Sequence, residues 1–130
     1  MSAANGSGLV LVVDDDADIR WSLGFVLEGG GYRVATAANG AEALSSLRGG
    51  GPLPDVILLD LRMPVMDGQQ FRETQLRDPA LARVPVVALS GDADLAARSR
   101  AMGIERFLLK PVDLDRLLSE LGRYSAPSLA

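Results

Sequence analysis

The sequence predicts an α/β fold, a (βα)5 doubly wound sheet of five parallel strands with helices on both faces. Two observations support this prediction. Short apolar runs alternate five times with stretches of helical periodicity along the 130 residues. The runs are almost continuously apolar, which is typical of parallel strands covered by helices on both faces. Because the segments between them are short, right-handed β-α-β units are the expected connections.

Each expected strand is a short apolar run that ends in a polar residue or a turn. The strands are expected at 9–13, 32–37, 55–60, 84–89 and 107–109. The central one contains the run Val-Ile-Leu-Leu and ends in the carboxylate of Asp60. Pro64 and Gly68 then mark a loop, because proline fixes φ and glycine permits positive φ. Asp60 is therefore expected at the carboxyl end of a buried central strand, where open α/β sheets place their ligands.

The helices between the strands are marked by caps, glycines and apolar spacing. Three polar residues can cap helices through their side-chain oxygens: Asp16, Asn39 and Asp113. The third helix is expected at 68–77, with Phe71 and Leu76 facing inward. The fourth helix is expected at 92–102, where a glycine closes it.

The first helix has one apolar face and one large side chain outside it. Its inward residues follow helical spacing and are Ile19, Leu23, Val26 and Leu27. Trp21 lies about 200° around the helix from Ile19, so its side chain is expected to point outward. Two interpretations of Trp21 remain open: contact with a partner protein, or packing flat against the neighbouring helix surface.

Length and composition favour one domain at 8–124, with flexible ends at 1–7 and 125–130. The net charge of −4 argues against a nucleic-acid-binding surface, which needs a basic patch. The chain has no cysteine and no histidine, which excludes disulfides, thiolate metal sites and histidine-based general base catalysis. No apolar run approaches the roughly 18 residues of a membrane span, so no membrane insertion is expected and a cytoplasmic location is the default.

Charged and hydroxyl groups follow four of the expected strands. They are the acidic cluster Asp14-Asp15-Asp16, Asp60, Ser90 and Lys110. The carboxyl ends of parallel strands meet at one edge of the sheet, so these groups can converge. Clustered carboxylates repel each other, and a hard divalent cation such as Mg²⁺ would offset that repulsion. Lys110 is the only lysine beside twelve arginines, which indicates that a compact ammonium is required there.

Four motifs, each at a strand end, give the sequence its resemblance to a known family. They are Val-Val-Asp-Asp at 12–15, Leu-Asp-Leu-Arg-Met-Pro-Val-Met-Asp-Gly at 59–68, Ala-Leu-Ser-Gly at 88–91 and Phe-Leu-Leu-Lys-Pro at 107–111. In this order they resemble response-regulator receiver domains of two-component phosphorelay systems, and the match covers residues 8–124. The resemblance implies a flavodoxin-like strand order, 2-1-3-4-5.

The resemblance also implies roles for the residues at the sheet edge, with Asp60 as the phosphoacceptor. The implied Mg²⁺ site consists of Asp14 (acting mainly through water), Asp15, Asp60 and the backbone carbonyl of Arg62. Ser90 and Lys110 would bind phosphoryl oxygens and act with Asp60 as the catalytic groups. Ser90 and Phe107 would form the switch. The family often has tyrosine at the Phe107 position, so the ring here offers no hydroxyl.

By this resemblance the chain is a phosphoacceptor signalling domain rather than an enzyme with a separate substrate. A histidine kinase or histidine phosphotransfer protein would donate a phosphoryl group to Asp60 in a Mg²⁺-dependent reaction. The donor must be another chain, because this chain has no histidine. The only catalysis expected is phosphorylation of its own aspartate and slow dephosphorylation. The phosphate would switch a surface that binds a downstream protein, without direct nucleic-acid binding. A stand-alone regulator and the receiver of a longer protein both fit.

Three other interpretations are weaker. A haloacid-dehalogenase-like phosphatase has a second aspartate two residues after its nucleophile, where this chain has Arg62. A flavodoxin-like cofactor carrier needs a phosphate cradle after its first strand, where three aspartates would repel the phosphate. A receiver-like module without phosphorylation would not need all of Asp15, Asp60, Ser90 and Lys110.

Two expectations concern the loops at this edge of the sheet. The Lys110–Pro111 peptide bond is expected to be cis, because X-Pro bonds have only a small trans preference and a sharp turn would direct the lysine over the site. Arg62 and Asp92 each lie two residues beyond a strand-end site residue. They are expected to form an ion pair across the mouth of the site, since their strands should be neighbours.

Overall fold

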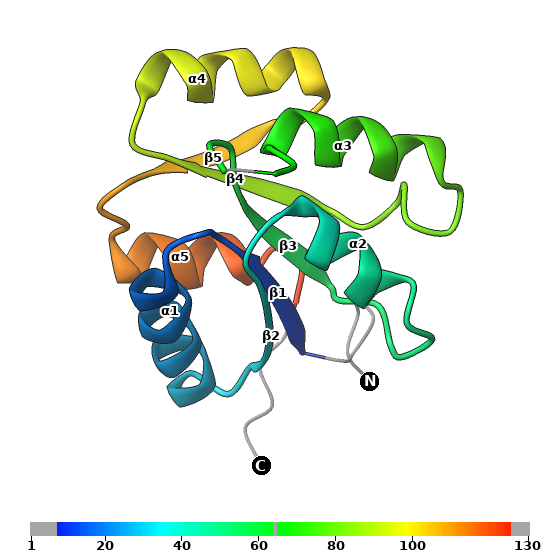
Figure 1. The fold of residues 1–130 in the computed structure, drawn as a ribbon. Helices are drawn as coiled ribbons and strands as arrows, with labels where there is room; N and C mark the ends of the chain where they lie inside the picture. The colour runs from blue at the N-terminus through cyan, green and yellow to red at the C-terminus, as the bar shows by residue number, and fades with distance from the viewer. Residues whose placement is uncertain (1–7, 64, 126–130) are drawn as a thin grey trace.

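The computed structural model describes residues 8–63 and 65–125 and contains one parallel sheet (Figure 1). Its strands are β1 (Leu9–Val13), β2 (Arg33–Ala37), β3 (Val56–Asp60), β4 (Val86–Ser90) and β5 (Arg106–Leu109). All neighbouring strands pair in parallel, in the order β2-β1-β3-β4-β5, which confirms the predicted sheet. The expected lead 1–7, residues 126–130 of the expected tail 125–130, and the loop residue Pro64 lie outside the described residues.

Helices cover both faces of this sheet, as predicted. They are α1 (Ala17–Gly29), α2 (Gly40–Leu47), α3 (Gly68–Arg77), α4 (Ala93–Arg98) followed by the 3₁₀ helix η1 (Ser99–Met102), and α5 (Leu114–Leu121). Figure 1 shows α1 and α5 on one side of the sheet and α2, α3 and α4 on the other. No helix in the described ranges is both long enough and apolar enough to cross a membrane.

Two apolar cores lie on opposite faces of the sheet because successive strand side chains point to opposite faces. One core joins Leu11, Ile57 and Leu59 to α2 and α3 through residues such as Leu44 and Phe71. The second core joins strand residues to α1 and α5; its members include Val10, Val12, Leu58, Leu27 and Leu117. The central strands are therefore buried on both faces. This packing fixes the position of their carboxyl ends.

The expected N-caps are confirmed. The Asp16 carboxylate accepts the backbone N–H groups of Asp18 and Ile19, 2.9 and 3.4 Å away. The Asn39 side chain accepts that of Glu42 at 2.9 Å, and Asp113 caps α5 in the same way. Each cap satisfies backbone donors that have no partner inside the helix. The caps at Asp16 and Asp113 fix helix starts directly after the strand ends that carry the acidic cluster and Lys110.

Leu76 does not face inward, so that prediction is wrong. Its side chain is 47% exposed, whereas the neighbouring Gln75 is completely buried. The Gln75 amide nitrogen donates to the carbonyls of Leu81 and Val84 at 3.0 and 2.9 Å. These bonds satisfy backbone groups of the turn after α3, so the buried position is taken by a polar residue with partners.

The fourth helix is shorter than expected, because its last turn tightens into a 3₁₀ helix. The Gly103 N–H donates to the Arg100 carbonyl at 3.0 Å, three residues back. Gly103 has a φ of +74°, a conformation that glycine adopts without strain and that ends the helical segment.

Ser125, which the sequence assigns to the flexible end, is buried in the domain. Its hydroxyl donates to the Asp55 carboxylate at 2.6 Å, and its carbonyl accepts from the Tyr32 hydroxyl at 3.2 Å. Asp55 also accepts the Gly8 N–H at 3.1 Å. These four residues join the segments before β1, β2 and β3 to the segment after α5, at the amino edge of the sheet.

Candidate functional site

A hollow of about 360 Å³ lies at the carboxyl edge of the sheet. The opposite edge holds Gly8, Tyr32, Asp55 and Ser125, which we call the amino-edge cluster. Its lining includes six of the residues selected from the sequence: Asp14, Asp15, Asp60, Arg62, Ser90 and Lys110. They come from the ends of β1, β3, β4 and β5, so the parallel sheet brings them together as expected. Phe107 does not line this hollow; it is half-buried and packs against the core beneath α2 and α3.

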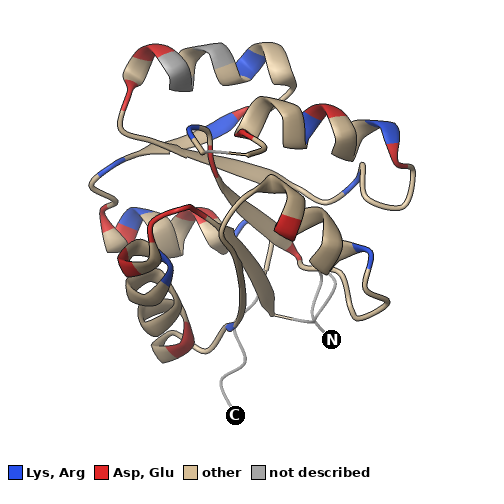
Figure 2. Cartoon of the chain, viewed as in Figure 1, with Lys and Arg blue, Asp and Glu red and all other residues tan. Residues whose placement is uncertain are grey.

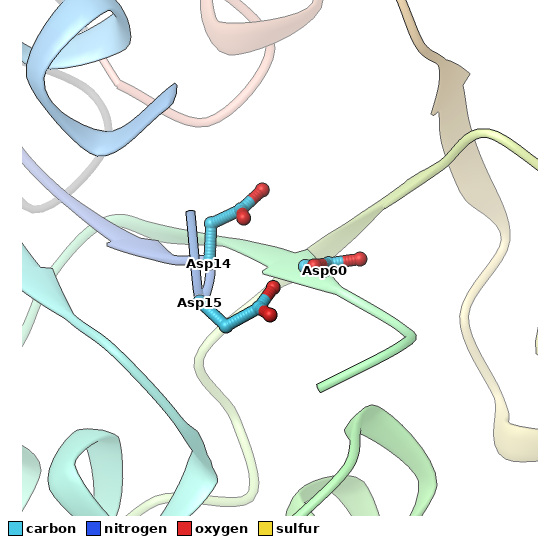
Figure 3. Close-up of side chains that lie close together, drawn as sticks. All are labelled: Asp14, Asp15 and Asp60. Atoms are coloured by element: carbon cyan, nitrogen blue, oxygen red, sulfur yellow. The ribbon is translucent and has the colours of Figure 1, made fainter. Parts of the chain in front are cut away.

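Three carboxylates meet in this hollow (Figure 3). Asp14 and Asp15 follow β1 and Asp60 ends β3, and one oxygen of each lies within 4.8 Å of the others. Asp14 and Asp60 are buried, whereas Asp15 is exposed. Figure 2 shows the acidic colouring of the loop between β1 and α1. Such a set of close oxygen donors fits a hard divalent cation, which prefers carboxylate and carbonyl ligands.

Asp14 is already engaged by groups of the protein. Its Oδ2 accepts from the Lys110 ammonium at 2.8 Å, and its Oδ1 accepts the Asp16 backbone N–H at 2.9 Å. Lys110 Nζ also lies 3.5 Å from Asp60 Oδ2. The lysine therefore contacts both buried carboxylates, and the acid that it contacts most closely is Asp14. The Lys110–Pro111 bond is cis, as expected.

The pKa of Asp60 is raised from 3.8 to about 6. Burial is the main cause, and the charge of Asp14 adds to it. The Arg62 backbone N–H, which donates to Asp60 Oδ1 at 3.1 Å, and the Lys110 ammonium act in the opposite direction. Asp60 is thus mostly ionised at neutral pH, and its buried charge lowers the stability of the folded chain.

The pKa of Lys110 is raised above 10.5. Burial alone would lower it, but the hydrogen bond to Asp14 and the charge of Asp60 outweigh burial. The ammonium is therefore charged throughout the neutral range, and it offsets part of the repulsion between the two buried acids.

Ser90 is turned toward its own loop. Its hydroxyl accepts the Asp92 N–H at 3.0 Å and donates to the Asp92 carbonyl at 3.1 Å. Both bonds are local and replaceable, so the hydroxyl can exchange them for an acceptor that enters the hollow.

The expected ion pair across the mouth of the hollow is present. Arg62 Nη2 lies 3.0 Å from Asp92 Oδ2, and the two side chains are 75% and 39% exposed. Because both charges are well hydrated, the pair contributes little to stability.

The loop after β3 returns tightly to the start of α3. A Cβ atom on Gly68 would lie 2.8 Å from the Leu61 Cα, closer than real side chains approach, so only glycine fits. Asp67 and Gln70 form a reciprocal capping box at this helix start. This tight return fixes the backbone that carries Arg62.

Arg20 is one residue of the site that the sequence analysis missed. Its Nη1 donates to the backbone carbonyl of Asp14 at 2.7 Å, which ties α1 to the acidic loop. A signal existed, because a positive charge near a helix N-terminus is unfavourable unless it has a local partner.

Comparison with known proteins agrees with this geometry. Residues 10–122 match the response regulator receiver domain, which shows that the chain belongs to this family.

Among the relatives, the DNA-binding transcriptional regulator NtrC of Escherichia coli K12 is 40% identical over 119 residues, 89% of this chain but only 24% of that protein. Sporulation initiation phosphotransferase F of Bacillus subtilis is 31% identical over 88% of this chain and 91% of its own length. The chemotaxis protein CheY4 of Vibrio cholerae, a solved structure, is 33% identical with a TM-score of 0.80 over 89% of this chain and 97% of that one.

Proposed function

We propose that this chain receives a phosphoryl group on Asp60 from a histidine kinase or a histidine phosphotransfer protein, in a Mg²⁺-dependent reaction, and thereby switches a protein-binding surface. The observation that carries the proposal is the position of Asp60. It is a buried carboxylate at the end of the central strand, beside two more acids and the only lysine. Membership of the receiver family supports the same reaction.

In the proposed reaction the ionised Asp60 attacks phosphorus in line with the leaving group. The bond from phosphorus to the donor nitrogen breaks as the bond to the Asp60 oxygen forms, which leaves the electron pair on the donor. Lys110, already 3.5 Å from Asp60, would neutralise charge on a phosphoryl oxygen. The Ser90 hydroxyl would exchange Asp92 for a second phosphoryl oxygen and draw the loop after β4 with it.

Mg²⁺ would be held by the carboxylates of Asp15 and Asp60 and by the Arg62 carbonyl. Asp14 would act through water, since both of its oxygens already have partners. When bound, the ion supplies positive charge that offsets the negative charge of the phosphoryl oxygens.

Incubation of the purified chain with acetyl phosphate and Mg²⁺ is expected to add one phosphoryl group at Asp60. Intact-protein and peptide mass spectrometry would measure the incorporation and its position. Chelation of Mg²⁺ and the Asp60→Asn variant should each abolish it, because an amide is not a nucleophile in this site. Stable incorporation into Asp60→Asn at another residue would contradict the assignment.

Loss of the phosphate is expected to accelerate modestly when the Arg62–Asp92 ion pair is removed. Both residues line the hollow, so the pair would hinder a water molecule that attacks in line. An exposed pair is worth about 0–1 kcal/mol. Arg62→Ala and Asp92→Ala should each speed the loss by at most about fivefold. The double variant should be no faster than either single one. Decay measured with excess Mg²⁺ tests this, and equal rates in all four proteins or additive effects would show that the pair does not shield the phosphate.

A further inference from the structure

The outer face of α1 carries two large exposed aromatic side chains. Trp21 is 71% and Phe25 67% exposed. Their rings stack on each other, with centroids 5.5 Å apart and planes inclined by 10°. In the described part of the chain, the other large exposed apolar side chains are scattered over different elements. Contiguous apolar surface of this kind typically marks an interaction site.

A hollow of about 360 Å³ lies beside the two rings, between α1 and the edge strand β2. Small or neutral residues form part of its lining, namely Gly24, Val34 and Thr36. Arg20 and Glu28 lie eight residues apart on the same helix and border the same hollow. We call the set Arg20, Trp21, Phe25 and Glu28 the aromatic face.

We propose that the aromatic face pairs with the same face of a second copy of this chain, with the two α1 helices antiparallel. In a two-fold symmetric dimer each contact occurs twice, so the surface must be complementary to itself. The charges meet this requirement, because the antiparallel arrangement places Arg20 of each copy near Glu28 of the other. Only Nη1 of the Arg20 guanidinium donates to the Asp14 carbonyl of its own chain. Trp21 of each copy then lies over Phe25 of the other.

The charge of the aromatic face differs from the charge of the whole chain. The net charge is −4, so two copies repel each other on average. The aromatic face instead carries one positive and one negative side chain. The mutual stacking of the two rings already restricts their rotamers, so little conformational entropy is lost on association.

The expected dimer is weak and leaves the hollow at the carboxyl edge of the sheet open. One helix face buries less than the roughly 1,200 Å² of a stable interface, so association should depend on concentration. Neither Trp21 nor Phe25 lines the hollow at the carboxyl edge. The inference therefore does not depend on the proposed phosphorylation.

The test uses Trp21 as its own reporter, because it is the only tryptophan of the chain. Sedimentation equilibrium from micromolar to millimolar protein should show a monomer–dimer equilibrium. The same concentrations should shift Trp21 emission to shorter wavelength and reduce its quenching by acrylamide. Phe25→Ala, which keeps the reporter, should weaken the dimer by roughly tenfold or more. Leu76→Ala, which removes an exposed apolar side chain from α3, is the matched control and should change nothing.

A charge reversal tests the antiparallel arrangement. Glu28→Arg would place arginines of the two copies against each other and should weaken the dimer. Glu73→Arg makes the same change of net charge on the exposed surface of α3 and should not weaken it. Equal effects of the two reversals would show that only net charge matters and would overturn the antiparallel pairing.

Three other results would overturn the proposal as a whole. They are a monomer at every concentration, equal effects of Phe25→Ala and Leu76→Ala, and shielding of Trp21 that occurs only after a kinase is added. The last result would assign the aromatic face to a different protein.

Discussion

Asp60→Asn is expected to raise the free energy of unfolding of the metal-free protein at neutral pH by about 2–3 kcal/mol, even though it removes the carboxylate that we propose as the phosphoacceptor. The pKa of Asp60 is raised from 3.8 to about 6 by burial and by Asp14. Each pKa unit corresponds to about 1.4 kcal/mol of differential stability between the two protonation states. The ionised carboxylate therefore destabilises the folded chain, and a neutral amide of the same shape would not.

The pH dependence of this effect has a defined sign. Between pH 3.8 and about 6 the folded state holds the Asp60 proton more tightly than the unfolded state does. Stability consequently falls as pH rises through this window and stays low above it. Asp60→Asn should lose this part of the pH dependence, so the two proteins should converge below the window.

Urea unfolding across this pH range, with a chelator present, would measure the difference. Glu73→Gln, a change at an exposed carboxylate of α3, is the control and should leave the curve unchanged. Added Mg²⁺ should reduce the difference, because it favours the ionised cluster of the unsubstituted protein. A less stable Asp60→Asn protein at neutral pH would contradict the interpretation of Asp60 as an energetically costly charge.

Lys110→Met is expected to have the opposite effect and to destabilise the chain by about 3–5 kcal/mol, the cost of leaving buried charges without their partner. The ammonium lies 2.8 Å from Asp14 Oδ2 and 3.5 Å from Asp60 Oδ2. Methionine keeps the apolar part of the side chain and removes only its charge. Because the pKa of Lys110 is raised above 10.5, its contribution is complete at neutral pH and is lost only at strongly alkaline pH.

A double-mutant cycle separates this charge effect from packing. With Asp60 already replaced by Asn, Lys110→Met should cost less, because one of the two carboxylates that it compensates is gone. Urea unfolding of the four proteins gives the coupling free energy. Additive effects, or a loss below about 1 kcal/mol for Lys110→Met alone, would show that the lysine acts as an ordinary surface charge.

The fold and the residues that line the site could be predicted from the sequence, because both depend on local patterns. A buried parallel strand needs a continuous apolar run, and the sheet then places every strand end at one edge. The resulting prediction brought Asp60, Ser90 and Lys110 into one hollow before any side chain was placed. The caps were equally local, since an N-cap residue bonds within its own helix.

The errors involve residues whose surroundings come from distant parts of the chain or from a neighbouring turn. Helical spacing could not show that Gln75, rather than Leu76, fills the interior by satisfying two carbonyls of the next turn. Ser125 follows the last periodic residue, and its partner Asp55 is 70 positions away in the sequence. The sequence made no prediction about which acid Lys110 contacts more closely, because its preference for Asp14 over Asp60 depends on side-chain reach, which spacing alone does not encode.

The amino-edge cluster has a practical consequence for anyone who expresses or labels this domain. A fragment cut after residue 124 would remove the Ser125 hydroxyl, which donates to the Asp55 carboxylate at 2.6 Å. Asp55 is only 1% exposed while Ser125 is in place, so the cut would also uncover a buried carboxylate. A fluorophore or affinity tag attached beyond Ser125 would leave from the side of the sheet remote from Asp60. Fusion at this end is therefore compatible with a donor protein that approaches the acidic hollow.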